Sequence, residues 1–400
     1  MAGTLTVDTI QSDSSYSSTL NVASKINFTS GMQIGGQDTT FGGMRNRIIN
    51  GDMRIDQRTA GASATATEWG YSLDRWVNYL SVAGKFSFRQ MNGVDTGASN
   101  YEANSTPPGF TNSVKLTSLS AYTIPAGGER YLFSQIIEGY NIADLAWGTA
   151  SAKAASLSFW VKSSLTGTFS GSISSTGQDA SFPYSYTINQ ANTWEYKTIS
   201  IPGPTTSSWN SSNGRGLWLF FDLGTGSTSK GVANGTWQGT SLYSATGAVS
   251  LVGTNAATLY LTGVQFEKGS VASAFEQLHY GHLLALCQRY YYKQSGASQY
   301  IRLGTGFVGA GSTTTLYAMV NFPVTMRAKP TSVDWAASLG VWNGGGIASV
   351  SNVTLESGSE STTTAVAVAT STGLTAQQPY QLIGNSSSTA ALAFNAELNS

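Results

Sequence analysis

The chain has 400 residues, only 10% of them charged, and its formal net charge is zero. An average soluble protein carries roughly 25% charged residues, and a nucleic-acid-binding surface needs an excess of Lys and Arg to neutralise phosphates. The composition therefore argues against a nucleic-acid partner and against docking of basic residues on an anionic membrane. No apolar run approaches the length of a membrane-spanning helix, so we expect no membrane insertion.

Glycine supplies 45 residues, and the aromatic residues are 16 Phe, 19 Tyr and 10 Trp. Gly, Ser, Thr and Asn favour turns and strands over helices, and each buried aromatic side chain removes ~150–250 Å² from water. We therefore predict an all-β protein of roughly two or three domains. The single cysteine, Cys287, excludes an intrachain disulfide framework. Met1–Thr6 lacks the charged and apolar regions of a signal peptide.

Residues 1–45 are predicted to form an extended arm. Apolar residues alternate with polar ones there, and the pattern is interrupted at Ser30-Gly31, which indicates strand–turn–strand structure. A two-stranded hairpin alone is only marginally stable in water, so we expect the arm to pack against sister chains or a partner protein. An unstructured tail is the alternative. The alternating apolar residues are Leu20, Val22, Ile26, Phe28, Met32 and Ile34.

Residues 46–276 are predicted to form a jelly-roll β-sandwich. Short runs rich in Phe, Tyr, Trp, Ile and Val are separated by Gly, Ser, Asn or Pro, as is typical of strands joined by turns. We expect 46–58 to be its first strand, with Met53 and Ile55 pointing inward, and 260–276 to be its closing partner.

The remaining chain is predicted to contain a helical connector, 277–293, and a smaller C-terminal β-sandwich, 294–400. Several apolar residues of the connector fall on one helical stripe, and short alternating runs return after it. The residues of the stripe are Leu283, Leu284, Leu286, Cys287 and Tyr290.

Several stretches carry recognisable motifs. They are Leu-Thr-Val-Asp-Thr-Ile-Gln-Ser at 5–12, Asn-Arg-Ile-Ile-Asn-Gly-Asp-Met-Arg-Ile-Asp-Gln-Arg at 46–58, Leu-Asp-Arg-Trp at 73–76, Gly-Thr-Trp-Gln-Gly-Thr at 235–240, Leu-Thr-Gly-Val-Gln-Phe-Glu-Lys-Gly at 261–269, Cys-Gln-Arg-Tyr-Tyr at 287–291 and Phe-Pro-Val-Thr-Met-Arg-Ala-Lys-Pro-Thr at 322–331. In this order they resemble a broad group of tail fibre and receptor-binding proteins of tailed bacteriophages, and the resemblance covers most of the chain.

The resemblance implies a carbohydrate-binding-module-like jelly roll in a homotrimeric virion protein. A β-rich composition without disulfides or an export signal also suits a protein that is assembled in the host cytoplasm and released in a particle. The resemblance further implies attachment to other tail or baseplate proteins through residues 1–45. The distal part, 294–400, would then recognise a host surface polysaccharide or lipopolysaccharide. Oligomerisation also suits a β-rich chain that must bury its sheet edges, and several copies of a weak site raise avidity.

No catalytic residues, cofactor or metal are expected. Glycoside hydrolysis needs two carboxylates ~5–10 Å apart, and the acidic residues are scattered; Asp74 and Glu267 each stand beside a basic residue. No nucleophile elbow, phosphate loop or zinc helix is present. His279 and His282, the only histidines, make an incomplete zinc site. A structural calcium held by carboxylates such as Glu267 stays an alternative.

Four aromatic residues are candidate ligand contacts, because sugars stack their C–H faces on aromatic rings and these four lie in polar, loop-like stretches. A packing or subunit-interface role is the alternative for each of them. The candidates are Trp209, Trp237, Tyr243 and Trp342. Four other tryptophans lie on predicted strands and are expected in the core: Trp76, Trp160, Trp194 and Trp218.

Two other functions stay open at this point. The chain could be a purely structural virion component, such as a baseplate protein, head fibre or spacer, whose sandwiches contact only other virion proteins. It could also be a polysaccharide depolymerase, although no paired carboxylates favour that function.

Overall fold

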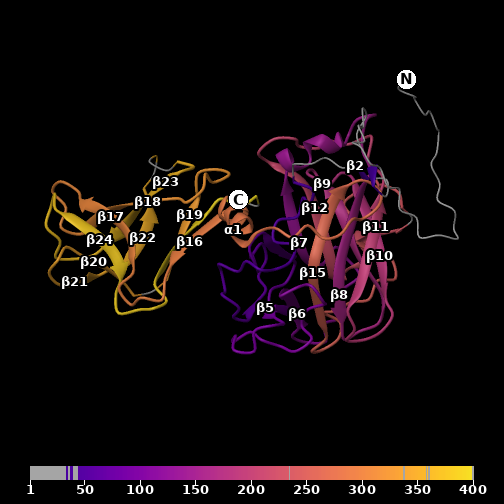
Figure 1. Cartoon of the computed structure of the whole chain (residues 1–400), viewed down its shortest axis with the longest axis horizontal. Coiled ribbons are helices and arrows are strands. Elements are labelled where there is room, and N and C mark those ends of the chain that lie inside the picture. The colour runs from indigo at the N-terminus through magenta and orange to yellow at the C-terminus, as the bar shows by residue number, and fades with distance from the viewer. Residues whose placement is uncertain are drawn as a thin grey trace, which may run out of the picture.

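The structure, a computed structural model, describes residues 33–34, 37–38, 44–233, 235–336, 338–356, 358 and 361–398. These residues form antiparallel sheets packed as sandwiches and one short α-helix, so the predicted all-β class is confirmed (Figure 1). Most of the predicted arm lies outside the described residues. Within it, β1 (Gln33–Ile34) pairs with β2 (Gln37–Asp38) in an antiparallel manner.

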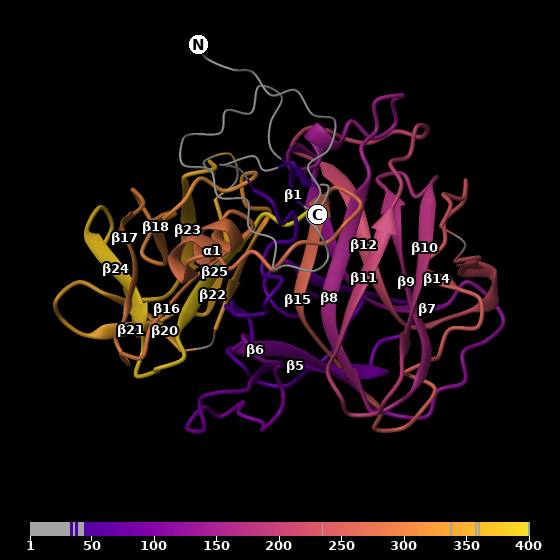
Figure 2. The ribbon, with the colours of Figure 1, turned by 45° about the vertical axis from the view of Figure 1, so that its right-hand side comes forward.

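The first sandwich consists of a five-stranded sheet, in the order β10-β9-β12-β7-β4, and a six-stranded sheet, in the order β11-β8-β15-β6-β5-β3. Figure 2 shows its long strands side by side. The bounds are β3 Ala64–Thr65, β4 Trp76–Leu80, β5 Phe86–Asn92, β6 Asn112–Ser118, β7 Arg130–Glu138, β8 Ala155–Ser163, β9 Gly167–Ser175, β10 Ser181–Ile188, β11 Glu195–Ile201, β12 Arg215–Thr225 and β15 Thr258–Lys268. Short accessory elements are η1 Gly139–Asn141, η2 Ala143–Leu145, η3 Ser227–Ser229, β13 Lys230–Gly231 and β14 Ser244–Ala245.

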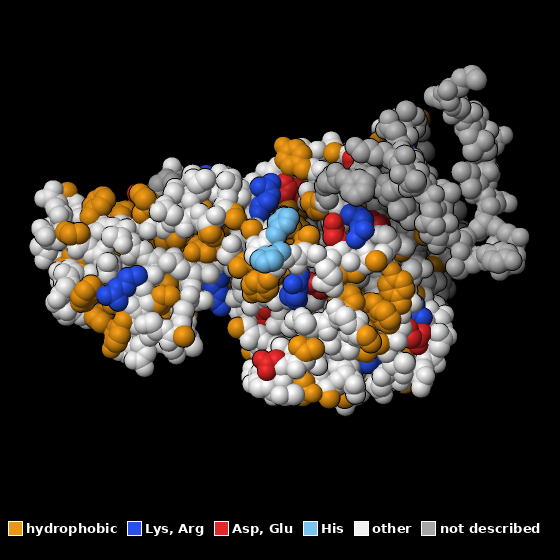
Figure 3. All heavy atoms as spheres, in the orientation of Figure 1, with side chains coloured by type: hydrophobic (Ala, Val, Ile, Leu, Met, Phe, Trp, Pro, Cys, Tyr) orange, Lys and Arg blue, Asp and Glu red, His pale blue; other side chains and the backbone are white. Residues whose placement is uncertain are grey.

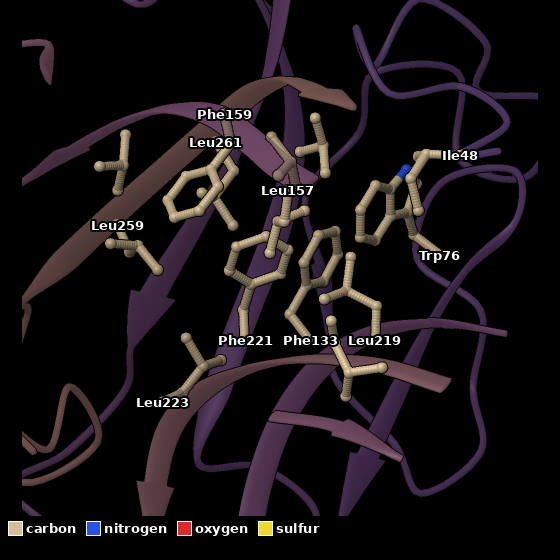
Figure 4. Close-up of a cluster of buried hydrophobic side chains, with 14 of the residues drawn as sticks. Ile48, Trp76, Phe133, Leu157, Phe159, Leu219, Phe221, Leu223, Leu259 and Leu261 are labelled. Carbon is tan, nitrogen blue, oxygen red and sulfur yellow. The ribbon is translucent and has the colours of Figure 1, made fainter. Parts of the chain in front are cut away.

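Aromatic residues fill the space between these two sheets. Trp76 is fully buried and stacks on Phe133, with 4.7 Å between ring centroids. Phe159 of the six-stranded sheet meets Phe221 of the five-stranded sheet edge-to-face at 5.1 Å (Figure 4). Such aromatic pairs add ~0.5–1.5 kcal/mol beyond the burial of their area. This core therefore holds the two sheets face to face.

The prediction of a first strand over 46–58 is wrong, although Met53 and Ile55 are buried as expected. The segment is a turn-rich loop in which Asn50 and Met53 both have φ near 60°. The Asn50 side chain closes this loop, because its amide donates to the Ile55 carbonyl and its oxygen accepts from the Ile55 N–H. The loop still packs on the predicted partner stretch, where the Val264 N–H donates to it over 3.0 Å.

Helix α1 (Tyr280–Gln288) leads from the first sandwich into a second one. The second sandwich has a three-stranded sheet, β16-β25-β19, and a seven-stranded sheet, β21-β20-β24-β17-β18-β23-β22. The bounds are β16 Tyr291–Ser295, β17 Arg302–Val308, β18 Thr315–Asn321, β19 Ser332–Trp335, β20 Leu339–Trp342, β21 Ile347–Ser349, β22 Asn352–Leu355, β23 Thr364–Thr370, β24 Pro379–Gly384 and β25 Ala391–Asn395. No helix in the described part of the chain is long and apolar enough to cross a membrane.

A second apolar layer covers the outer face of the five-stranded sheet. Leu283 and Cys287 of α1 are buried against Val77 and Ile136 of the sheet, and Leu398 near the chain end joins the same cluster. The predicted helical stripe therefore has a partner, and the first sandwich does not expose this face to water.

A buried ion pair lies beside this apolar layer. Glu397, fully buried, binds the guanidinium of Arg75, which is 1% exposed, and also accepts from Arg58 at 3.0 Å. The Arg75 guanidinium lies 3.7 Å from the centre of the Tyr290 ring. Since Arg75 precedes β4 and Glu397 follows β25, the pair joins the two sandwiches. We call this polar cluster the junction.

Backbone carbonyls complete the junction. Arg327 donates to the carbonyls of Ala396 at 2.8 Å, Glu397 at 2.9 Å and Asn213 at 3.1 Å. Arg289 pairs with the buried carboxylate of Glu138 at 2.7 Å. Buried charges are tolerated when they are paired and hydrogen-bonded, and each of these groups has such a partner.

The substitution Glu397→Gln should destabilise the folded protein by about 3 kcal/mol, because it leaves the Arg75 charge buried without its counter-ion. Urea denaturation measures the change in the free energy of unfolding. The control is Glu68→Gln, whose carboxylate is half exposed and 4.0 Å from Arg130; it should change stability by less than about 0.5 kcal/mol. Equal effects of the two substitutions would contradict a stabilising role of the junction.

Candidate functional site

The outer face of the seven-stranded sheet presents a row of side chains, one from each of five neighbouring strands. In register across the sheet, Trp342 lies opposite Gln381, Gln381 opposite Thr305, Thr305 opposite Met319 and Met319 opposite Val366. Strands are ~4.8 Å apart, so the ends of this row are about 19 Å apart. We call it the Trp342 row. Figure 1 shows β17, β20 and β24 at the end of the molecule away from the first sandwich.

Trp342 borders a pocket of about 240 Å³ at one end of the row. Its indole N–H donates to the Gly345 carbonyl at 3.1 Å, which fixes the ring. The guanidinium of Arg302 lies 4.9 Å from the ring centroid, and its Nε donates to Gln381 Oε1 at 3.0 Å. The pocket is lined by Thr305, Trp342, Asn343, Gly344, Pro379, Tyr380 and Gln381.

A more apolar hollow of about 480 Å³ continues the same face. Phe307 and Met319 are 60% and 57% exposed there, which is unusual for large apolar side chains. The lining residues are Thr305, Gly306, Phe307, Tyr317, Met319, Glu356 and Val366. Both hollows share Thr305, so they form one continuous surface along the Trp342 row. Figure 3 shows few charged side chains on the visible face of this sandwich.

Trp209 and Trp237 lie in the first sandwich, where they form a cluster with Trp147. The three rings meet edge-to-face, with centroids 4.8, 5.5 and 5.4 Å apart. Trp237 also donates to the Pro202 carbonyl at 2.7 Å. Both predicted residues are half-buried against the core, so much of their aromatic surface serves packing.

Tyr243 is buried, with 7% of its surface exposed. It packs edge-to-face on Tyr79 and Phe220 in the apolar layer outside the five-stranded sheet, and its hydroxyl donates to Gln178 at 2.9 Å. It therefore offers no ring face to a ligand. Of the four predicted aromatic residues, the structure brings Trp342 alone to the exposed face of the seven-stranded sheet.

The tryptophans predicted in the core divide into two groups. Trp76 and Trp218 are buried, at 0% and 3% exposure. Trp160 and Trp194 are only half-buried and contact Tyr196 and Tyr260, respectively, away from the space between the sheets. The prediction fails for this second pair because an alternating pattern shows which residues share a face, and does not show which face is covered.

The metal-ligand candidates are placed as follows. His279 precedes α1, and its ring nitrogen accepts from the Gly281 N–H at 3.3 Å; His282 is exposed. The Glu267 carboxylate accepts hydrogen bonds from Ser273 and from the Gln265 amide. Within the described ranges, no three His, Cys, Asp or Glu side chains are grouped as a metal site would need.

Sequence reasoning missed the neighbours of Trp342. Arg302 and Thr305 lie on β17 and Gln381 lies on β24. Both strands are far from Trp342 in the chain, and only strand pairing brings them to the indole. The alternating pattern of β17 and β18, which leaves Phe307 and Met319 exposed, was a signal in the sequence that could have indicated this open face.

Comparison with known proteins gives similarity to solved structures alone. No family model matches the sequence, and no curated protein matches it. The enzymatically active domain of tailspike protein 4 from Bacteriophage CBA120 is 12% identical, with a TM-score of 0.31, over 56% of this chain and 21% of that chain. A putative sugar binding protein from Bacteroides thetaiotaomicron is 12% identical, with a TM-score of 0.30, over 56% of this chain and 100% of that chain. The family 11 carbohydrate-binding module of Clostridium thermocellum is 12% identical, with a TM-score of 0.24, over 54% and 99%.

Trp237→Ala should lower the free energy of unfolding by about 2–3 kcal/mol, because it removes a ring packed against Trp147 and Phe182. Trp342→Ala should cost less than about 1 kcal/mol, since its ring lies at the rim of an open pocket. Urea denaturation of both variants tests this difference, and a larger loss for Trp342→Ala would show that Trp342 is chiefly a packing residue.

Proposed function

We propose that the protein binds a carbohydrate chain, without catalysis, through the Trp342 row. The observation that carries this proposal is a partly exposed indole that borders an open pocket and shares one sheet face with an amide, a hydroxyl and a guanidinium. Carbohydrates pair C–H faces with hydroxyl groups, so they need an aromatic surface with hydrogen-bonding groups beside it. The row is about 19 Å long, which suits an oligosaccharide better than a single sugar.

The outer faces of the first sandwich support this choice of surface. Its five-stranded sheet is covered by α1 and the chain end. On its six-stranded sheet, the basic side chains are already bonded to the loop that contains Glu102 and Asn104. Glu102 pairs with Lys115 at 2.6 Å, and Lys162 donates to the Asn104 carbonyl at 2.7 Å. The seven-stranded sheet, in contrast, has both hollows open to solvent.

The small number of acidic residues around the two hollows favours binding over hydrolysis. Among the residues that line the two hollows, Glu356 alone carries a carboxylate. Glycoside hydrolases of the usual kind place two carboxylates on either side of the bond that they cleave. We therefore expect the bound glycan to stay intact.

The sequence resemblance supports a setting for this binding. We propose that the chain is a tail fibre protein of a bacteriophage, attached to other tail or baseplate proteins through residues 1–45, and that it recognises a polysaccharide or lipopolysaccharide of the host surface. A trimer would present three such faces, and multivalent attachment raises avidity ~10²–10⁴-fold without new contacts.

A purely structural role is the second candidate, because the apolar hollow around Phe307 and Met319 would also suit another virion protein. Adsorption competition separates the two roles. Purified protein that binds host cells and blocks phage adsorption supports the receptor-binding role, whereas protein that does neither supports the structural role.

Trp342→Ala should weaken binding to the host glycan at least tenfold, because it removes the stacking surface and opens the pocket wall. Binding to whole host cells and to their extracted lipopolysaccharide provides the measurement. Trp194→Ala, which removes a half-buried tryptophan from the first sandwich, is the matched control and should bind normally. The site assignment fails if the two variants lose binding equally.

The proposed trimer predicts a mass in solution three times that of the 42.0 kDa chain. Light scattering coupled to size-exclusion chromatography measures it for the full chain. A stable monomer across the micromolar range would contradict the trimer and would leave the Trp342 row as a single weak site.

A further inference from the structure

We infer that the glycan bound at the Trp342 row is anionic, and that Arg302 receives its carboxylate or phosphate group. This inference rests on the proposed function and specifies its ligand class. It begins from the position of the guanidinium, which lies over the Trp342 ring, 4.9 Å from its centroid. A sugar bound in the pocket that Trp342 borders would bring its substituents close to this cation.

Two hydrogen bonds hold the Arg302 guanidinium in place. Its Nε donates to Gln381 Oε1 at 3.0 Å, and its Nη1 donates to the Tyr300 carbonyl at 2.7 Å. Both acceptors are neutral, so the positive charge is fixed in position without being neutralised. Binding to a guanidinium that is already held in place costs less side-chain entropy than binding that must first order a free arginine.

The surroundings leave this charge uncompensated. None of the residues that line the Trp342 pocket is acidic, and across the described residues no carboxylate pairs with Arg302. Glu356 borders the other hollow, beyond the shared Thr305. This situation differs from that of Arg58 and Arg75, which both bind Glu397. An anion at Arg302 would form a charge-assisted hydrogen bond, which is roughly twice as strong as a neutral one.

The experiment compares wild-type protein with Arg302→Gln, Arg302→Lys and Trp342→Ala on an array of bacterial polysaccharides that includes uronate-bearing, phosphate-bearing and neutral examples. We expect the wild type to prefer acidic glycans. Arg302→Gln should weaken their binding about tenfold, and it should weaken that of neutral glycans by a smaller factor, because a neutral glycan loses a hydrogen-bond donor but no ionic partner. Arg302→Lys keeps the charge but loses the planar fork, so it should recover part of the affinity.

Treated ligands then identify the anion. Methyl esterification of the best uronate glycan, or phosphatase treatment of the best phosphate glycan, should reduce wild-type binding to the level of Arg302→Gln, and only one of the two treatments should act on a given ligand. Raising the salt concentration should weaken the wild type more than Arg302→Gln. Melting temperatures of the variants within about 2 °C of the wild type show that folding is intact.

The possible failures are distinguishable. If neutral glycans bind the wild type as well as acidic ones do, or if Arg302→Gln leaves acidic binding unchanged while Trp342→Ala abolishes it, the anionic ligand is wrong and the proposed function stands. If Trp342→Ala binds every glycan as the wild type does, or if the wild type binds no glycan at all, the proposed function fails and the inference fails with it.

Discussion

The buried ion pair between Arg75 and Glu397 fixes how the two sandwiches sit relative to each other. Burying two charges costs several kcal/mol per ion, and the junction offsets this cost with Arg58, the Tyr290 ring and the Ile136 carbonyl, which accepts from Arg75 at 2.6 Å. The burial of this region also affects the pKa of the neighbouring Asp74. Burial raises the pKa of this carboxyl to about 6, even though Arg58 and hydrogen bonds from Gln57 favour the charged form.

The two sandwiches use their outer faces differently, although both carry large apolar side chains there. In the first sandwich, a second layer that includes α1 residues covers the apolar outer face of the five-stranded sheet, whereas Phe307 and Met319 stay exposed on the seven-stranded sheet. In the second sandwich, the core face of β23 carries Ala365, Ala367 and Ala369. Its outer face stays open, and this opening makes the Trp342 row available to a ligand.

Much of this fold could be predicted from alternating patterns, and the failures have physical causes. The segment 46–58 alternates like a strand, but the Asn50 side chain bonds within the segment and takes the place of a partner strand. Trp342 was predicted in a loop because three glycines follow Asn343. In the structure these glycines form the turn between β20 and β21, so the indole ends a strand.

The residues that surround Trp342 could not be predicted from the sequence, for a related reason. Arg302, Trp342 and Gln381 are separated by about 40 residues at each step, and the order of strands in the sheet makes them neighbours. Strand order depends on how whole faces are buried, which no local pattern records. Aromatic residues in polar stretches supplied Trp342 as a candidate, but they did not show that Tyr243 would be buried.

The return of the chain end to the first sandwich has a mechanical consequence. The polypeptide crosses the junction once outward, after α1, and once back, at Ala396–Leu398; the Ala396 N–H donates to the Tyr290 carbonyl at 2.8 Å, so the two crossings are bonded to each other. The Leu398 carbonyl then accepts from Arg215 of β12 at 2.7 Å. A pull on the outer sheet is therefore shared between a covalent path and a parallel hydrogen-bonded one. The second sandwich would act as a braced extension of the first, and it would transmit torque as well as tension.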